Sequence, residues 1–208
     1  MAAGHDDPAR RSVPQPVPTG VWNSRRILVG VTGGIAAYKA AHLVSRLAQG
    51  GATVTVAMTP GATRFITPLT FQALSGRPVY TTPWEHIESN DPQHISLARA
   101  LDAAVVAPCS MDALARLAQG RADDVVSLIL SAVDRAKTPV LLAPAMNSVM
   151  YAQPATQRNI EQLRADGFDF VGPGTGWQAC REVGPGRMSE PEEILASLAA
   201  LVARESPA

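Results

Sequence analysis

The chain has 208 residues, of which 46% are hydrophobic and 17% are charged, and its 18 basic and 18 acidic residues cancel. This length and composition predict one globular domain with a single core. The balanced charge argues against a nucleic-acid binder or a membrane-surface protein, and no apolar run approaches the roughly 20 residues of a membrane helix. We therefore expect a protein that acts on small molecules, without nucleic-acid or membrane partners.

Residues 1–24 contain several prolines among polar and small residues, and they lack the apolar core of a signal peptide. This composition predicts a flexible tail, followed by one domain over residues 25–204. Cys109 and Cys180 are too few for a disulfide framework and lack the spacing of a zinc site. We expect a cytoplasmic protein with no bound metal.

A first strand is predicted over residues 26–31, where the sequence is continuously apolar, and it ends in a glycine turn at Gly33 and Gly34. Apolar residues at helical spacing follow. Glycines at this point let the backbone approach a ligand, and the free amides at the start of the helix favour a phosphate. The alternative is that the two glycines only make the turn, since the full G-x-G-x-x-G pattern is absent.

The second predicted strand, residues 52–58, completes a βαβ unit and is followed by Thr59, Pro60 and Gly61. A dinucleotide site would want an acidic residue near this point, where it binds the ribose hydroxyls. Its absence favours a mononucleotide over NAD.

Another apolar strand, over residues 102–108, ends in proline and is followed by Cys109, Ser110 and Asp112. We expect Ser110 to contact a ligand at the start of the next helix. Asp112 is either a ligand contact or an acid favoured by the helix dipole. Cys109 fits a buried small side chain better than a nucleophile.

The strand that ends at Pro144 delivers Asn147 to the same edge of the sheet. An amide can hold a carboxylate, but asparagine is also a favoured helix cap, and the cap is the simpler interpretation of this residue alone. His94 stands at the start of another predicted helix, where the dipole favours a neutral imidazole. An isolated histidine is more often a surface or capping residue. Asp123 and Asp124 are interpreted as caps rather than metal ligands.

Residues 172–188 form a glycine-rich stretch that is too long for a passive connection, and we expect a mobile lid that carries Cys180. A cysteine on such a lid can reach a ligand and donate a proton. The alternative is a surface loop that happens to hold a thiol. Ser189 and Glu192 are expected to form the capping box of a closing helix. The alternation of strands and helices predicts a doubly wound parallel sheet with right-handed crossovers.

In this order, the glycine turn, His94, the Pro-Ala-Met-Asn stretch at 144–147 and the Ala179-Cys180 lid resemble the flavin-dependent cysteine decarboxylases, with a Rossmann-like flavoprotein fold. The resemblance covers roughly residues 26–203. It implies an FMN-dependent carboxy-lyase of coenzyme A biosynthesis, which converts 4'-phosphopantothenoylcysteine to 4'-phosphopantetheine. The implied chemistry is oxidation of the substrate thiol, loss of CO2, and reduction of the resulting enethiolate, with FMN ending unchanged.

The resemblance also assigns roles to residues. It implies His94 and Cys180 as the catalytic residues, with Cys180 as proton donor, and Asn147 as the binder of the substrate carboxylate. Substrate contacts are implied for Ala145, Met146 and Ala179, and FMN contacts for Gly33, Gly34, Ile35, Thr59, Ser110, Asp112 and Ala113.

Family members are homotrimers or assemblies of trimers such as dodecamers, so the resemblance implies that His94 serves the flavin of a neighbouring subunit. A separate phosphopantothenoylcysteine synthetase is an expected partner, because the synthetase domain of many relatives does not follow in this chain. Four positions depart from the family pattern: Pro60 and Gly61 after Thr59, Asp112 in place of asparagine, and Arg181 in place of glycine.

Three other functions remain open at this point. An oxidative decarboxylase of peptide cysteines would leave the enethiol and would not need Cys180 for reduction. A flavin prenyltransferase shares the fold but does not call for the 144–147 stretch or the cysteine lid. A non-catalytic regulator would typically carry long acidic extensions.

Overall fold

The computed structural model describes residues 20–84 and 92–204. Its centre is a six-stranded parallel sheet in the order β3-β2-β1-β4-β5-β6, which confirms the predicted doubly wound fold. The strands are β1 (Arg26–Val31), β2 (Thr53–Met58), β3 (Val79–Tyr80), β4 (Ala103–Cys109), β5 (Val140–Pro144) and β6 (Asp169–Phe170).

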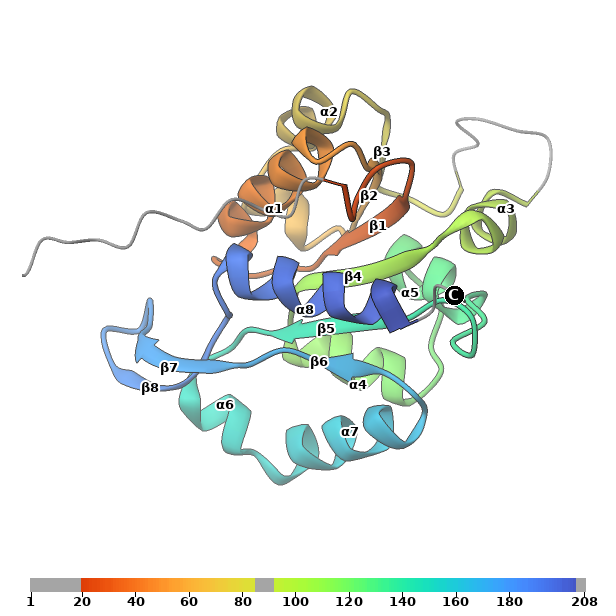
Figure 1. Cartoon of the computed structure of the whole chain (residues 1–208). Helices are drawn as coiled ribbons and strands as arrows, with labels where there is room; N and C mark the ends of the chain where they lie inside the picture. Colours follow the sequence, from red (N-terminus) through yellow and green to blue (C-terminus); the bar gives the residue numbers. More distant parts are fainter. Residues whose placement is uncertain (1–19, 85–91, 205–208) are drawn as a thin grey trace, which may run out of the picture.

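Helices cover both faces of this sheet, and in Figure 1 α8 crosses in front of it while α4 and α5 lie behind. No helix of the described residues is long and apolar enough to cross a membrane. The helices are α1 (Ala37–Gln49), the 3-10 turn η1 (Ala62–Arg64), α2 (Pro68–Ser75), α3 (Gln93–Ala100), α4 (Met111–Ala118), α5 (Val125–Ser131), α6 (Ser148–Ala152), α7 (Pro154–Ala165) and α8 (Pro191–Arg204).

The apolar runs of the sequence become strands that are buried on both sides. In β1, Ile27 and Val29 pack into one hydrophobic cluster with α1 and α8, whereas Leu28 packs into the other with α5. Successive side chains of a strand point to opposite faces, so a strand covered on both faces must be apolar throughout. These strands are therefore recognised in the sequence as continuous apolar runs, not by the alternation of polar and apolar residues that a half-exposed strand shows.

The strand order reverses between β1 and β4, and the loops that leave these two strands are tied together at this point. The hydroxyl Oγ1 of Thr32 donates to the carbonyl of Pro108 at 2.7 Å and accepts from the backbone N–H of Ser110 at 2.9 Å. Helices α1 and α4 start from these loops on opposite faces of the sheet. Such a switch point opens a crevice at the carboxyl ends of the strands.

The glycine-rich residues 172–188, for which the sequence predicted a mobile lid that carries Cys180, contain secondary structure that was not predicted. They form an antiparallel hairpin of β7 (Gly174–Trp177) and β8 (Val183–Arg187), with Cys180 in the connecting turn. The hairpin projects from the edge of the molecule beside α6 (Figure 1). Its glycines lack the side chains that would show alternation in the sequence.

Helix caps confirm one prediction and correct another. Of the two acids interpreted as caps, Asp124 caps α5, and its side chain accepts from two backbone N–H groups in a capping box with Ser127, whereas Asp123 pairs with Arg116 and Arg121 instead. At α8, however, the returning bond runs from the backbone N–H of Glu190 to the carboxylate of Glu193 at 3.0 Å, one residue beyond the predicted Ser189 and Glu192. Pro191 at the helix start is compatible with this shift.

The packed domain begins before residue 25, where composition placed the end of the tail. Residues 1–19 lie outside the described part of the chain, but Trp22 is 0% exposed and packs in the core cluster of α1 and α8. Its ring lies against Gly50, where an added Cβ would come within 2.7 Å of Trp22 Cδ1. The segment from residue 20 is therefore part of the fold.

We expect Trp22→Ala to lower the free energy of unfolding by about 3–5 kcal/mol, because it removes a large side chain from the core. Trp84→Ala is the matched control, since Trp84 is 86% exposed, and it should change stability by less than about 0.5 kcal/mol. Urea denaturation measures both. Equal effects of the two substitutions would show that the 20–24 segment does not contribute to the core.

Candidate functional site

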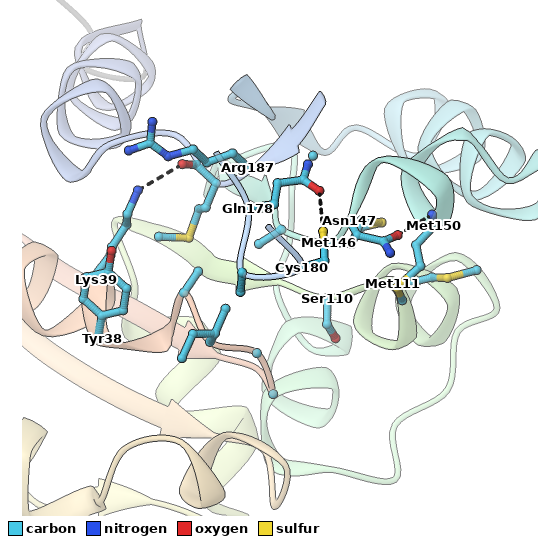
Figure 2. A pocket seen from close by; sticks show the side chains of 18 of the residues that line it. Tyr38, Lys39, Ser110, Met111, Met146, Asn147, Met150, Gln178, Cys180 and Arg187 are labelled. Carbon is cyan, nitrogen blue, oxygen red and sulfur yellow. Dashed lines mark hydrogen bonds between the residues drawn. The ribbon is translucent and has the colours of Figure 1, made fainter. Parts of the chain in front are cut away.

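The main cavity lies at the switch point, with a volume of about 470 Å³. It is bounded by the start of α1, the start of α4, the 145–150 segment and the β7–β8 hairpin (Figure 2). This arrangement brings the expected residues Gly33, Gly34, Ile35, Ser110, Ala145, Met146, Asn147, Ala179 and Cys180 into one site.

A second cavity of about 370 Å³ adjoins the first and shares Gly33 and Ser110 with it. The remaining expected cofactor residues, Thr59, Asp112 and Ala113, line this second space. Both volumes fall in the range of ligand pockets, roughly 300–1,000 Å³. An elongated ligand can therefore contact both groups of residues across the shared wall.

The start of α1 offers backbone donors to this crevice. Its N-cap, Ala36, makes no side-chain capping bond, and the first turn contains no acidic residue. The backbone N–H groups of Ala37 and Lys39 donate to the carbonyls of Gly34 and Ala36 at 3.0 Å. No side-chain acceptor or acidic residue compensates the positive end of the helix dipole, and such an end favours a bound anion. The two glycines differ in their roles: a Cβ on Gly33 would lie 3.1 Å from the backbone of Gly61, whereas a Cβ on Gly34 would meet nothing within 4 Å. Gly33 thus serves packing, and Gly34 leaves the cavity open.

Gly61, one of the departures from the family pattern, lies at this contact. It follows β2, and a Cβ on it would lie 3.5 Å from Gly33 Cα, which is an ordinary van der Waals distance. The contact therefore requires glycine at position 33 more than at position 61. Pro60 and Gly61 both line the second cavity beside Thr59.

Asn147 is a helix cap that also lines the main cavity. Its Oδ1 accepts from the backbone N–H of Met150 at 2.8 Å, so it caps α6 as predicted. The same side chain lines the main cavity, as Figure 2 shows. The cap uses only the oxygen, and the two amide donors remain for a ligand acceptor.

The thiol of Cys180 lies at the opposite wall, on the turn of the hairpin. Its Sγ is 3.5 Å from Oε1 of Gln178 and 3.8 Å from Oε2 of Glu182. Both neighbours are acceptors, so the S–H is directed at an oxygen. The other cysteine, Cys109, is fully buried in β4, and burial raises the pKa of its thiol, which confirms its interpretation as a core residue.

Two cations at the rim of the main cavity were not found from the sequence. Lys39 is only 8% exposed, and its Nζ donates to Oε1 of Glu190 at 3.0 Å. Arg187, on β8, also pairs with Glu190. Figure 2 shows Lys39 and Arg187 on the side of the cavity away from Met150. A single carboxylate therefore faces two cations at this end.

The second cavity has a different electrostatic balance. Arg116 binds Asp112 through Nε at 2.8 Å and also pairs with Asp123, and these hydrogen bonds, to Asp123 first, raise the pKa of the guanidinium. The same pair lowers the pKa of Asp123. The sequence left two interpretations of Asp112 open, an acid at the start of a helix or a ligand contact. In the structure its carboxylate is paired with Arg116.

His94 is not part of this site. It lies at the start of α3, and neither cavity includes it. In Figure 1, α3 lies at the opposite end of the molecule from the hairpin. Within the described ranges, 20–84 and 92–204, no group of three or more histidine, cysteine or acidic side chains is arranged to hold a metal ion.

A doubly wound parallel sheet with its crevice at the switch point between β1 and β4 defines a Rossmann-like α/β protein. Comparison with known families makes this more specific. The chain belongs to the Flavoprotein family, whose sequence model matches residues 19–203.

Individual relatives are consistent with this assignment. The coenzyme A biosynthesis bifunctional protein CoaBC of Haemophilus influenzae is 46% identical over 176 residues, which are 85% of this chain and 43% of that protein. A cysteine-to-serine variant of PPC decarboxylase, solved in complex with pantothenoylaminoethenethiol, is 28% identical with a TM-score of 0.77, covering 88% of this chain and 100% of that one. The FMN-dependent cysteine decarboxylase SpaF is 29% identical, with a TM-score of 0.75 and coverages of 88% and 99%. The chain thus spans less than half the length of the bifunctional relative.

We predict that Asp123→Asn destabilises the protein at neutral pH and that this effect disappears in acid. Because Arg116 lowers the pKa of Asp123, the carboxylate contributes stability above its ordinary pKa of about 3.9 and loses it as the pH falls through the lowered value. Thermal unfolding of the two proteins between pH 7 and pH 2 measures this. A stability difference that does not change with pH would contradict the ion pair.

Proposed function

We propose that this protein decarboxylates 4'-phosphopantothenoylcysteine to 4'-phosphopantetheine with the help of FMN, as a carboxy-lyase of coenzyme A biosynthesis. The observation that carries the proposal is the pairing of Asn147 and Cys180 in one cavity beside the uncapped start of α1. An amide donor, a thiol and an anion site are the groups that this reaction requires from the protein.

The crevice fits FMN. The uncapped amides at the start of α1 suit its phosphate, and the apolar side chains of Ile35, Met111 and Met146 suit a flat aromatic ring. Gly33, Gly34, Ser110, Thr59, Asp112 and Ala113 complete the cofactor residues that we propose. When bound, FMN supplies the chemistry of taking a hydride from the substrate and returning it.

The residues of the chain bind the substrate and move its proton. Asn147 donates its amide hydrogens to the substrate carboxylate and keeps it in place until CO2 leaves. Ala145, Met146 and Ala179 contact the substrate along the cavity wall. The S–H of Cys180 then gives its proton to the substrate carbon, which allows reduction of the enethiol to the final thiol. The described complex of PPC decarboxylase with an enethiol supports this order of events.

The cations at the rim suit the phosphorylated end of the substrate. Lys39 and Arg187 converge on Glu190, and a phosphate can replace this carboxylate as their partner. An uncharged peptide chain gains nothing from two cations at this place. This observation favours a phosphorylated small molecule over the peptide substrates of an oxidative cysteine decarboxylase.

We also propose that the active form is a homotrimer or an assembly of trimers, in which His94 completes the site of a neighbouring subunit. Ile35, Tyr38, Phe65 and Leu69 expose large apolar side chains on or near α1 and α2. Such exposed side chains are typical of an interface between subunits. The cytoplasm is the proposed location, and a separate phosphopantothenoylcysteine synthetase is the proposed supplier of the substrate.

The function is tested by purifying the protein and incubating it with 4'-phosphopantothenoylcysteine. We expect a yellow protein that releases FMN on denaturation and forms CO2 and 4'-phosphopantetheine in equal amounts. A protein that holds flavin but leaves this substrate unchanged would contradict the proposal. Incubation with a prenyl phosphate should leave the flavin unaltered, as a prenyltransferase would not.

Asn147→Asp separates the two roles of Asn147. Aspartate still caps α6, but it replaces the two amide donors by a negative charge beside the substrate carboxylate. We expect unchanged thermal stability and a loss of CO2 release of at least about 100-fold, because like charges brought together cost several kcal/mol.

The matched control is Asn159→Asp on α7, which lines neither cavity and should retain the activity. If Asn147→Asp decarboxylates like the wild type, the amide serves only as a cap, and the assignment of the carboxylate site fails.

Mixed oligomers test the role of His94. His94→Asn and Asn147→Asp should each be inactive alone, but co-expressed subunits should regain activity, because one interface then joins an intact His94 to an intact Asn147. Recovery is measured as CO2 release from the tagged and purified mixed assembly. Mixtures that stay inactive would show that His94 does not serve a neighbouring site.

A further inference from the structure

Gln178 has the most heavily bonded side chain of the hairpin, although it is a neutral residue to which neither the fold nor the chemistry assigns a role so far. It follows β7 and is only 8% exposed. Its Nε2 donates to the carbonyl of Pro185 at 2.8 Å and to that of Gly184 at 3.2 Å. Its Oε1 accepts from the backbone N–H of Ser148 at 3.2 Å and from Sγ of Cys180 at 3.5 Å. Both donors and the acceptor of the amide are therefore in use.

These bonds join the hairpin to the segment that carries Asn147. Ser148 is the residue after Asn147, and the backbone N–H of Met146 donates to the carbonyl of Gly186 at 2.9 Å. The two elements approach so closely that a Cβ on Gly186 would lie 2.3 Å from the carbonyl oxygen of Met146. Asn147 and Cys180 therefore lie on two segments that are hydrogen-bonded to each other, and the side chain of Gln178 contacts both segments.

The contact with Cys180 gives the amide a more specific task than holding the hairpin. A thiol on an exposed turn can rotate, and its hydrogen has no fixed direction unless an acceptor selects one. Figure 2 shows Oε1 of Gln178 directed at Sγ of Cys180 inside the cavity. The other acceptor, Glu182, is more distant at 3.8 Å. The amide oxygen thus selects the rotamer in which the thiol faces the cavity.

We propose that Gln178 is the positioning residue for proton donation by Cys180, and that it couples the orientation of the thiol to the segment of Asn147. The inference rests on the proposed function. During the reaction the S–H bond breaks and its proton forms the new C–H bond of the substrate, and the remaining thiolate regains a proton from water. Gln178 is unchanged in this step, since it only directs the thiol.

The test substitution is Gln178→Met, which keeps the length of the side chain and removes its donors and acceptor. CO2 and 4'-phosphopantetheine are measured separately, together with the enethiol. We expect CO2 release to fall by only a few-fold, whereas formation of 4'-phosphopantetheine falls roughly 10- to 100-fold and enethiol accumulates, because misplaced donors lose this much. A parallel fall of both rates without enethiol would reduce Gln178 to a structural role and overturn the proposal.

Thr175→Val is the matched control, because Thr175 is an exposed residue of the same hairpin and does not line the cavity. It should leave both rates and the product unchanged. Enethiol release by this variant would show that any change in the hairpin misdirects the thiol, and would remove the special role of Gln178.

Alkylation of Cys180 by iodoacetamide tests the orientation of the thiol independently of the decarboxylation reaction. Cys109 is buried, so only Cys180 should react in the folded protein. In Gln178→Met the freed thiol should react several-fold faster than in the wild type, with bound flavin retained in both. Equal rates would overturn the role of Gln178. If the wild type instead releases no CO2 while the alkylation rates differ, the proposed function fails and the positioning of the thiol stands.

Discussion

The side chain of Thr32 holds the two strand ends on which the whole site depends. It is 1% exposed, and its single hydroxyl bonds both the carbonyl of Pro108 and the N–H of Ser110. This fixes the ends of β1 and β4 where their helices part to opposite faces. Ser110, held in this way, caps α4 by accepting from the N–H of Ala113, while α1 starts uncapped. The start of α4 is therefore capped by a protein side chain, whereas the start of α1 is available to a ligand.

The opposite wall is built differently, because it comes from a hairpin rather than from the sheet. Glycines in β8 let the hairpin lie directly on residues 146–148. The side-chain amide of Gln178 accepts from the backbone N–H of Ser148 and donates to the carbonyl of Pro185. The turn ends at Arg181, whose φ of 67° lies in the left-handed region. A residue with a Cβ costs roughly 1–2 kcal/mol there. Arg181, where glycine is usual, thus places strain beside Cys180 in the turn of the hairpin.

The sequence predicted the sheet well because a strand covered on both faces must be apolar throughout, and β1, β4 and β5 each read as such a run. Asp124 was predicted as a cap because its chemistry is local. The hairpin was missed, since glycines carry no alternating pattern. Lys39 was missed because a lysine rarely lies buried, and its partner Glu190 is 151 residues away. His94 lies on α3, outside both cavities, and the role that we propose for it at a neighbouring subunit is one that no local pattern encodes.

The central claim is that the switch-point crevice, between the starts of α1 and α4, holds FMN. Hydrogen–deuterium exchange of the protein stripped of flavin and then reloaded with FMN tests it most directly. The account predicts slower exchange in peptides that cover residues 33–36 and 110–113, which line the two joined cavities. A third cavity, lined by Arg25, Arg99 and Lys137, provides the comparison. Protection confined to peptides around those three residues would contradict the account.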